Sequence, residues 1–146
     1  MKQRVISGAV LIALVIVCMI LSPYTRILLF TAAAVLSVPE LKNVFRLKDI
    51  KCVDWAVYFF IAGEAGLTVL GLSAPVSFVY YLALLFVSMF CAAMAGILDE
   101  KVHGAGALAT DGILLYPMFL YAAITYIGVS EGWIATFVIA CLATWV

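Results

Sequence analysis

The sequence predicts an all-α membrane protein, a polytopic bundle of about five complete transmembrane helices followed by a truncated sixth. Of the 146 residues, 68% are hydrophobic and 11% are charged, whereas a soluble domain is about half apolar and a quarter charged. The apolar residues form long runs, and the charges gather in one stretch, Pro39–Asp54. We therefore assign residues 1–146 to a single transmembrane domain.

Four of the five complete spans follow from apolar runs that are long enough to cross a bilayer. They are Val5–Leu21, Val53–Leu72, Val76–Leu98 and about Gly112–Val129. The first run resembles a signal peptide but ends without a small-x-small cleavage pattern, so we expect a retained helix. Pro117 predicts a kink in the last run because proline has no N–H to donate to the helix.

The remaining span begins after Pro23 and is harder to delimit. Tyr24–Val38 is about 22 Å long as a helix, which is shorter than the roughly 30 Å of hydrocarbon. A kinked helix that continues past Pro39 to about Phe45 would be long enough. The alternative is a break after Val38 and a restart, because Ser37 and Glu40 have the spacing of a capping box.

The polar segment Asp99–Asp111 is predicted to be a loop, since two glycines within it disfavour a helix. On this interpretation His103 is a solvated loop residue, and Asp111 is an interfacial charge that the N-terminus of the next helix favours. A metal site formed by Asp99, Glu100 and Asp111 is a less favoured alternative.

The last apolar run, Trp133–Val146, has 14 residues, below the roughly 17 to 25 that a crossing helix needs. A helix that stopped inside the membrane would leave unpaired carbonyl groups in hydrocarbon. We therefore expect this chain to be part of a longer membrane protein.

Basic residues predict the orientation in the membrane. With a cytoplasmic N-terminus, seven basic residues are on the inner side: Lys2, Arg4, Lys42, Arg46, Lys48, Lys51 and Lys101. The outer segments then hold only Arg26. Because basic residues collect on the cytoplasmic side, we predict an inner or cell membrane protein with its N-terminus in the cytoplasm. The same inner residues, Lys101 excepted, are candidate contacts for anionic lipid headgroups.

Glu64 is the most conspicuous single residue because it lies near the middle of a predicted span, where a carboxylate is costly. It is either a functional residue on a substrate or ion pathway, or a protonated group that bonds helices together. Two pairs of small residues, Ala62 with Gly66 and Ala92 with Gly96, predict close packing between the third and fourth spans.

Several function classes lack support. Net charge is zero, and no basic face remains once the membrane-flanking residues are set aside, so we expect no nucleic acid partner. The four cysteines are far apart and include no C-x-x-C pair, so neither a disulfide framework nor a zinc site is predicted. Without a P-loop, G-x-S-x-G or H-E-x-x-H motif, the chain has no self-contained active site.

Four stretches together resemble the phosphatidate cytidylyltransferase (CDP-diacylglycerol synthase) family. They are Lys2-Gln3-Arg4-Val5-Ile6 before the first span, Glu40-Leu41 at the end of the second span, Ala109-Thr110 with Gly112-Ile113-Leu114-Leu115-Tyr116, and Leu142-Ala143-Thr144-Trp145-Val146. Glu40-Leu41 is similar to the family's first basic loop. The last stretch is similar to the approach to the family's first catalytic segment, and the resemblance covers nearly the whole chain.

The resemblance implies transfer of CMP from CTP to phosphatidic acid, with Mg²⁺ as cofactor and CDP-diacylglycerol and pyrophosphate as products. It also implies that the catalytic and metal-binding residues lie beyond Val146, so we assign no catalytic residue or metal ligand and expect this chain alone to be inactive. A second copy of the chain is a further candidate partner. The alternative is a small integral membrane transporter subunit or assembly protein, with Glu64 as its intramembrane functional residue.

Overall fold

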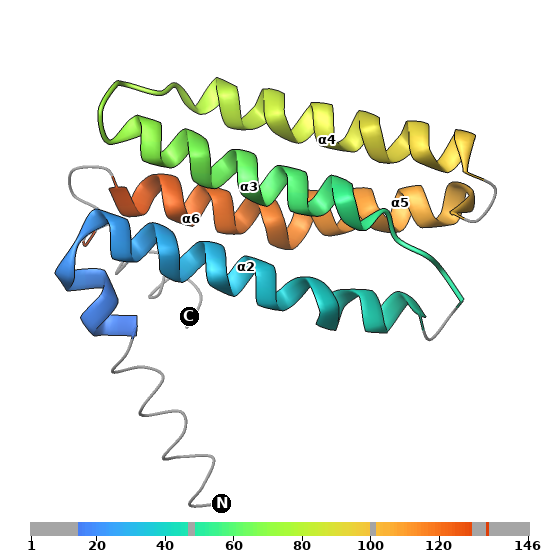
Figure 1. Ribbon diagram of the computed structural model, residues 1–146, viewed down its shortest axis with the longest axis horizontal. Coiled ribbons are helices and arrows are strands. Elements are labelled where there is room, and N and C mark those ends of the chain that lie inside the picture. Colours follow the sequence, from blue (N-terminus) through green and yellow to red (C-terminus); the bar gives the residue numbers. More distant parts are fainter. Residues whose placement is uncertain (1–14, 47–48, 100–101, 130–133, 135–146) are drawn as a thin grey trace, which may run out of the picture.

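The computed structural model describes residues 15–46, 49–99, 102–129 and 134, and all regular structure in this part of the chain is helical. Residues 15–21 are helical, and after them come α2 (Pro23–Arg46), α3 (Asp54–Gly71), α4 (Phe78–Leu98), α5 (His103–Ile113), the π-helical turn η1 (Leu114–Met118) and α6 (Phe119–Val129). Figure 1 shows the long helices lying side by side and antiparallel to their neighbours in sequence. The predicted all-α class is confirmed.

Three helical segments of the described chain are long and apolar enough to cross a membrane. They are α2, α4 and the continuous segment His103–Val129, which joins α5, η1 and α6. Many large hydrophobic side chains point outward. Leu28, Phe86 and Ile97, for example, are 70%, 67% and 77% exposed. Such a surface suits hydrocarbon better than water, so the fold is compatible with a membrane protein.

α2 is one helix of 24 residues with Pro39 inside it. At 1.5 Å per residue it is about 36 Å long, enough to cross the hydrocarbon core. The Ser37 hydroxyl donates to the Ala34 carbonyl at 2.8 Å instead of capping a new helix. The continuous helix is therefore confirmed, and the alternative of a restart at Ser37 is wrong.

α5 corrects the prediction of a loop over residues 99–111, because the helix begins at His103. The reason is packing: α5 lies so close to α4 that a Cβ atom on Gly96 would be 2.6 Å from the Cβ of Ala107. Close tertiary contact outweighs the low helix propensity of glycine here. Asp111 consequently lies inside a helix and not at its start, while His103 is exposed at the helix start with a φ of 53°.

Pro117 lies in the π-helical turn η1, between α5 and α6. A proline removes one helical hydrogen bond and crowds the preceding turn, and a wider π turn accommodates this. The predicted irregularity at Pro117 is confirmed, but the helical segment around it starts nine residues earlier than the predicted Gly112.

The core lies between α2, α3, α4 and the continuous segment α5–η1–α6, and its largest fully buried side chains include Phe60, Tyr81 and Met118. Small residues do bring α3 and α4 together, but at Gly63, where a Cβ atom would be 2.7 Å from the Leu84 side chain. Gly66 has no such neighbour within 4 Å, so the predicted contact through Gly66 is wrong.

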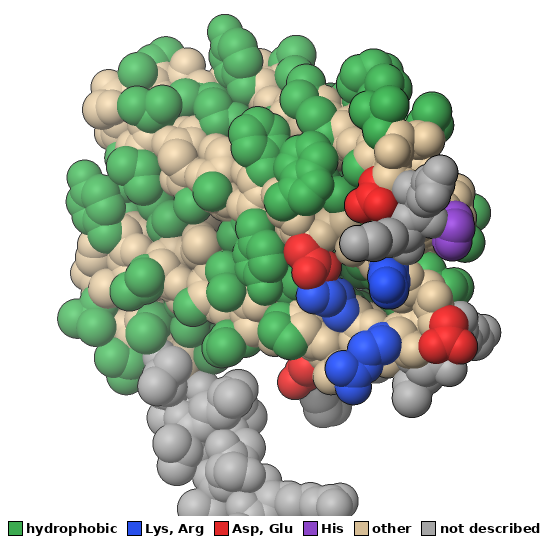
Figure 2. Space-filling model, turned by 45° about the vertical axis from the view of Figure 1, so that its right-hand side comes forward, with side chains coloured by type: hydrophobic (Ala, Val, Ile, Leu, Met, Phe, Trp, Pro, Cys, Tyr) green, Lys and Arg blue, Asp and Glu red, His purple; other side chains and the backbone are tan. Residues whose placement is uncertain are grey.

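The two ends of the bundle differ in charge. The charged end, where α2 and α4 finish and α3 and α5 begin, carries the side chains of Lys42, Arg46, Asp49, Lys51, Asp54, Asp99 and His103. Figure 2 shows acidic and basic side chains gathered on one part of a surface that is otherwise largely hydrophobic. The hairpin end, opposite, holds the connection between α3 and α4 and the last turn of α6. There the buried Arg26 side chain donates to the Gly128 carbonyl.

The predicted first span is described only over residues 15–21, and the final run Trp133–Val146 lies outside the described residues except for Ile134.

Candidate functional site

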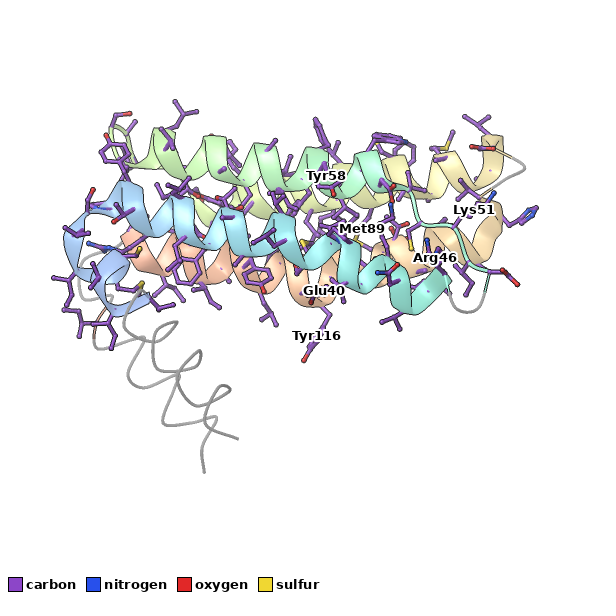
Figure 3. The ribbon with its side chains drawn as sticks, turned by 60° about the horizontal axis from the view of Figure 1, so that its bottom comes forward. Glu40, Arg46, Lys51, Tyr58, Met89 and Tyr116 are labelled. Atoms are coloured by element: carbon purple, nitrogen blue, oxygen red, sulfur yellow. The ribbon has the colours of Figure 1, made fainter. Side chains whose placement is uncertain are left out.

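A pocket of about 400 Å³ lies at the charged end, between the last turns of α2 and the segment that leads into α3. Its lining residues are Pro39, Lys42, Asn43, Arg46, Ile50, Lys51, Cys52 and Asp54. Three of them are basic and one is acidic, so the charge of the pocket favours an anionic ligand. Figure 3 shows Arg46 and Lys51 together at this end of the bundle.

Two of the basic side chains come from one face of α2, because Lys42 and Arg46 are four residues apart. After Arg46 the chain reverses through Asp49, whose φ of 56° lies in the left-handed region that aspartate tolerates better than most residues. N–H groups of this turn donate to carbonyls in the last turn of α2 at 3.1 and 3.2 Å. The reversal brings Lys51 back beside α2.

α5 holds the segment that carries Lys51. The Lys51 carbonyl lies directly against Gly106, and a Cβ atom at Gly106 would overlap it. The buried N–H of Val53 donates to the Thr110 hydroxyl at 2.8 Å, and that hydroxyl donates to the Gly106 carbonyl at 2.8 Å. The wall of the pocket is therefore fixed by the helix that the sequence predicted to be a loop.

An ion pair between Lys42 and Asp54 joins the two sides of the pocket. Their side chains are 38% and 43% exposed, and ion pairs of such exposure contribute about 0–1 kcal/mol. The second oxygen of Asp54, Oδ1, is buried without a hydrogen-bond partner among the described residues. Because the pair is weak, an anion that entered the pocket could compete with Asp54 for Lys42.

Cys52 is a free, half-buried cysteine in the pocket wall. Burial raises the pKa of its thiol, and the negative charge of Asp54 raises the pKa further, whereas Lys42 and the Thr110 hydroxyl act in the opposite direction. A raised pKa keeps the thiol protonated at neutral pH, so Cys52 is poorly suited to act as a nucleophile.

The structure brings together three of the six residues that the sequence nominated for lipid headgroups, namely Lys42, Arg46 and Lys51. The other three, Lys2, Arg4 and Lys48, lie outside the described residues. Glu64 is not part of this pocket, because it lies in the interior of the bundle and is 2% exposed.

Sequence reasoning missed Gly106 and Thr110, which position the pocket without lining it. Their spacing of four residues would place both on one helical face. This spacing is informative only if the segment is a helix, and the glycines in the segment favoured the prediction of a loop.

The described part of the chain has no suitable set of ligands for the Mg²⁺ that the family resemblance implies. Mg²⁺ takes octahedral coordination by oxygen atoms, usually from carboxylates, phosphates and water. Asp54 and Asp111 each have a buried oxygen without a partner among the described residues, but no group of three potential ligand residues occurs there. Neither Asp99 nor Asp111 thus belongs to a metal-binding cluster in this part of the chain, and Glu100 lies outside it.

No protein-family model, curated protein or solved structure matches this chain. The chemistry of the charged-end pocket and the sequence resemblance are therefore the grounds on which a function can be proposed.

Proposed function

We propose that this chain is the membrane portion of a phosphatidate cytidylyltransferase and that the charged-end pocket binds the phosphate of phosphatidic acid. The observation that carries the proposal is the cluster of Lys42, Arg46 and Lys51 around one cavity at the end of an apolar bundle. In the reaction, the lipid phosphate attacks the α-phosphorus of CTP and pyrophosphate leaves. The residues of this chain would hold and orient the lipid phosphate, and they would not catalyse the transfer by themselves.

The chemistry of the pocket favours a phosphomonoester over other lipid headgroups. A phosphomonoester carries about −1.5 to −2 charges at pH 7 and three terminal oxygens. Arg46 can donate two parallel N–H bonds to such a group, and Lys51 adds a compact positive charge. A phosphodiester headgroup has one negative charge and a bulky substituent, so it gains less from the same three cations.

The membrane topology is part of the proposal: five complete helices, a truncated sixth and a cytoplasmic N-terminus in the inner or cell membrane. α3, with 18 residues, is about 27 Å long and would cross with its neighbours α2 and α4. The excess of basic residues on one side supports the orientation. The pocket would then face the cytoplasm, where CTP is found.

Lipid binding to the purified chain in nanodiscs tests the proposal. We expect phosphatidic acid to bind more tightly than phosphatidylglycerol, which is anionic but a phosphodiester. Arg46→Gln should weaken phosphatidic acid binding about five-fold, which corresponds to roughly 1 kcal/mol for one basic residue at a membrane surface. Arg46→Lys is the matched control, since it keeps the charge and should lose only the part that depends on paired N–H groups.

Equal affinity for the two lipids, with an equal loss for both in Arg46→Gln, would show a nonspecific electrostatic anchor and would contradict the proposal.

A second candidate is a small membrane transporter subunit or assembly protein, and the burial of Glu64 inside the bundle favours it. On this hypothesis Glu64→Gln alters transport or assembly, and a membrane that carries an extended form of the chain makes no CDP-diacylglycerol from CTP. CTP-dependent labelling of lipid in such membranes would rule it out.

A further inference from the structure

Glu64 is an acidic side chain enclosed in the bundle, and no basic side chain of the described residues pairs with it. It lies on α3, is 2% exposed, and has one carboxyl oxygen, Oε1, with no hydrogen-bond partner among the described residues. An ionised carboxylate in such surroundings is strongly disfavoured unless a cation accompanies it. The side chain therefore needs either a proton or a bound cation.

The groups that face Glu64 are hydroxyls and not bases. From α6, the Thr125 hydroxyl lies near the carboxyl, and its proton is donated to the Tyr121 carbonyl at 2.7 Å. From α4, the titratable neighbour is Tyr81, with Tyr126 of α6 packed against it. The described chain provides Glu64 with no lysine, arginine or histidine partner, and Arg26 of α2 is bound to α6 at the hairpin end.

This arrangement suits a protonated carboxyl. A hydroxyl that already donates its one proton can still accept a hydrogen bond. Thr125 can thus accept from a neutral Glu64 while it donates to Tyr121, whereas it could not donate to a carboxylate at the same time. The proton in a hydrogen bond between these two groups must therefore be carried by the Glu64 carboxyl.

Two further hydroxyl groups, those of Thr68 and Tyr81, lie between the Glu64 main chain and the hairpin end of the bundle. Thr68, one helical turn along α3, donates to the Glu64 carbonyl at 2.9 Å. Its oxygen lies 2.8 Å from the Tyr81 hydroxyl, which must be the donor because the Thr68 proton is already used. Thr68 and Tyr81 also line a pocket of about 230 Å³, together with Tyr126 and the connection between α3 and α4.

We propose that Glu64 is a proton-binding site of the membrane domain, and that it exchanges its proton with water at the hairpin end through the pocket at Thr68 and Tyr81. Water in that pocket would lie about one helical turn, roughly 6 Å, from Glu64. The site goes beyond the lipid-binding proposal and lies at a different level of the bundle, because the lipid pocket is at the charged end.

Carbodiimide modification tests the site directly, since these reagents react with protonated carboxyl groups to form a stable adduct. The full chain in nanodiscs is treated with the membrane-permeant dicyclohexylcarbodiimide, and the modified residue is identified by peptide mass spectrometry. We expect an adduct on Glu64 that decreases as the pH is raised and is absent from Glu64→Gln. The identification uses the unaltered chain, so it does not depend on whether Glu64→Gln folds.

The route is tested with a water-soluble carbodiimide. Thr68→Val, which removes the hydroxyl at nearly constant volume, should slow modification of Glu64 several-fold. Ser88→Ala is the matched control, because Ser88 is also buried and donates only to the Leu84 carbonyl of its own helix. It should leave the rate unchanged.

Three results would overturn the proposal. Failure of Glu64 to react at any pH would exclude a protonated carboxyl. Protection of Glu64 by Na⁺ or K⁺ at constant pH would identify a cation site in place of a proton site. Equal rates in Thr68→Val and the unaltered chain would exclude the hairpin-end route. None of these results bears on phosphatidic acid binding, which is measured separately.

Discussion

The charged-end pocket and the surroundings of Glu64 present the same chemical group in two different settings. Asp54 and Glu64 each have a carboxyl oxygen that is buried without a partner among the described residues. Asp54 is close to half exposed and is paired with Lys42, while Glu64 is enclosed and faces hydroxyl groups. Lys42 pairs with the first carboxylate, whereas the described residues place no cation beside the second, so a proton is its simplest partner.

The comparison shows that function in an apolar bundle depends on what surrounds each ionisable group. At the charged end a dense cluster of charges can bind an anion, because three basic side chains line one pocket. On our proposal a single carboxyl in the interior responds to pH, since no basic side chain pairs with it among the described residues. The following predictions separate these two regions, beginning with the largest expected effect.

Gly106→Val should disrupt the charged end. The added side chain would overlap the Lys51 carbonyl, and overpacking of this kind costs about 1–3 kcal/mol. We expect a lower unfolding midpoint in detergent, followed by circular dichroism, and loss of phosphatidic acid binding. Glu64 should still react with carbodiimide wherever the bundle remains folded.

Gly104→Ala is the control for that substitution. Gly104 is in the same helix but has nothing within 4 Å of its Cβ position. Alanine favours a helix over glycine by up to about 1 kcal/mol, so stability should be unchanged or higher. Equal destabilisation by the two substitutions would contradict the contact between α5 and Lys51.

Thr110→Val should also destabilise the wall of the pocket, by about 1–3 kcal/mol, because it leaves the buried N–H of Val53 without an acceptor. The unfolding midpoint measures this effect. Ser88→Ala, in the interior of the bundle, removes a hydroxyl that donates only to a carbonyl of its own helix and should cost less stability. The reverse order would show that the interior, and not the charged end, depends on its hydroxyl group.

Asp54→Asn should strengthen phosphatidic acid binding, because it removes the carboxylate that competes for Lys42. The gain is limited to about 1 kcal/mol, or about five-fold in affinity, by the weakness of an exposed ion pair. A titration of nanodiscs with phosphatidic acid measures it. Weaker binding in Asp54→Asn would mean that Asp54 positions Lys42 for the ligand.

The same substitution should have a small effect on Cys52. Removing the negative charge of Asp54 removes one cause of the raised thiol pKa, so the pKa should decrease and more thiolate should form at a given pH. In a chain whose other cysteines are alanine, the rate of maleimide addition near pH 8 should increase in Asp54→Asn. An unchanged rate would mean that burial alone controls the thiol.

Composition and the lengths of the apolar runs were sufficient to predict α2, α3 and α4 and the position of most of their ends. The length argument correctly extended α2 through Pro39, since a shorter helix could not cross the hydrocarbon. The prediction of a loop in place of α5 was wrong. Glycine lowers helix propensity, and the contacts of α5 with α4 and Lys51 compensate for that low propensity. Propensity can be read from one segment, but a tertiary contact needs both partners.

The candidate site was predicted in part. The dense charge of Pro39–Asp54 led us to nominate Lys42, Arg46 and Lys51 as contacts for lipid headgroups, and the structure places these three around one pocket. The pairing of Lys42 with Asp54 was not predicted, because it depends on the turn after α2 that reverses the chain. Glu64 was singled out by its position in an apolar run, yet its neighbours Thr68, Tyr81 and Thr125 come from three helices and could not be inferred from spacing.

The most direct test of the central claim is whether the phosphate of phosphatidic acid touches the side chains of the charged-end pocket. Solid-state NMR can measure ¹⁵N–³¹P dipolar coupling between labelled arginine and lysine side chains and the lipid in bilayers. We predict coupling of phosphatidic acid to Arg46 and Lys51, with signals assigned by Arg46→Gln and Lys51→Gln, and weaker coupling of phosphatidylglycerol. Coupling that is absent, or equal for the two lipids, would contradict a phosphomonoester site.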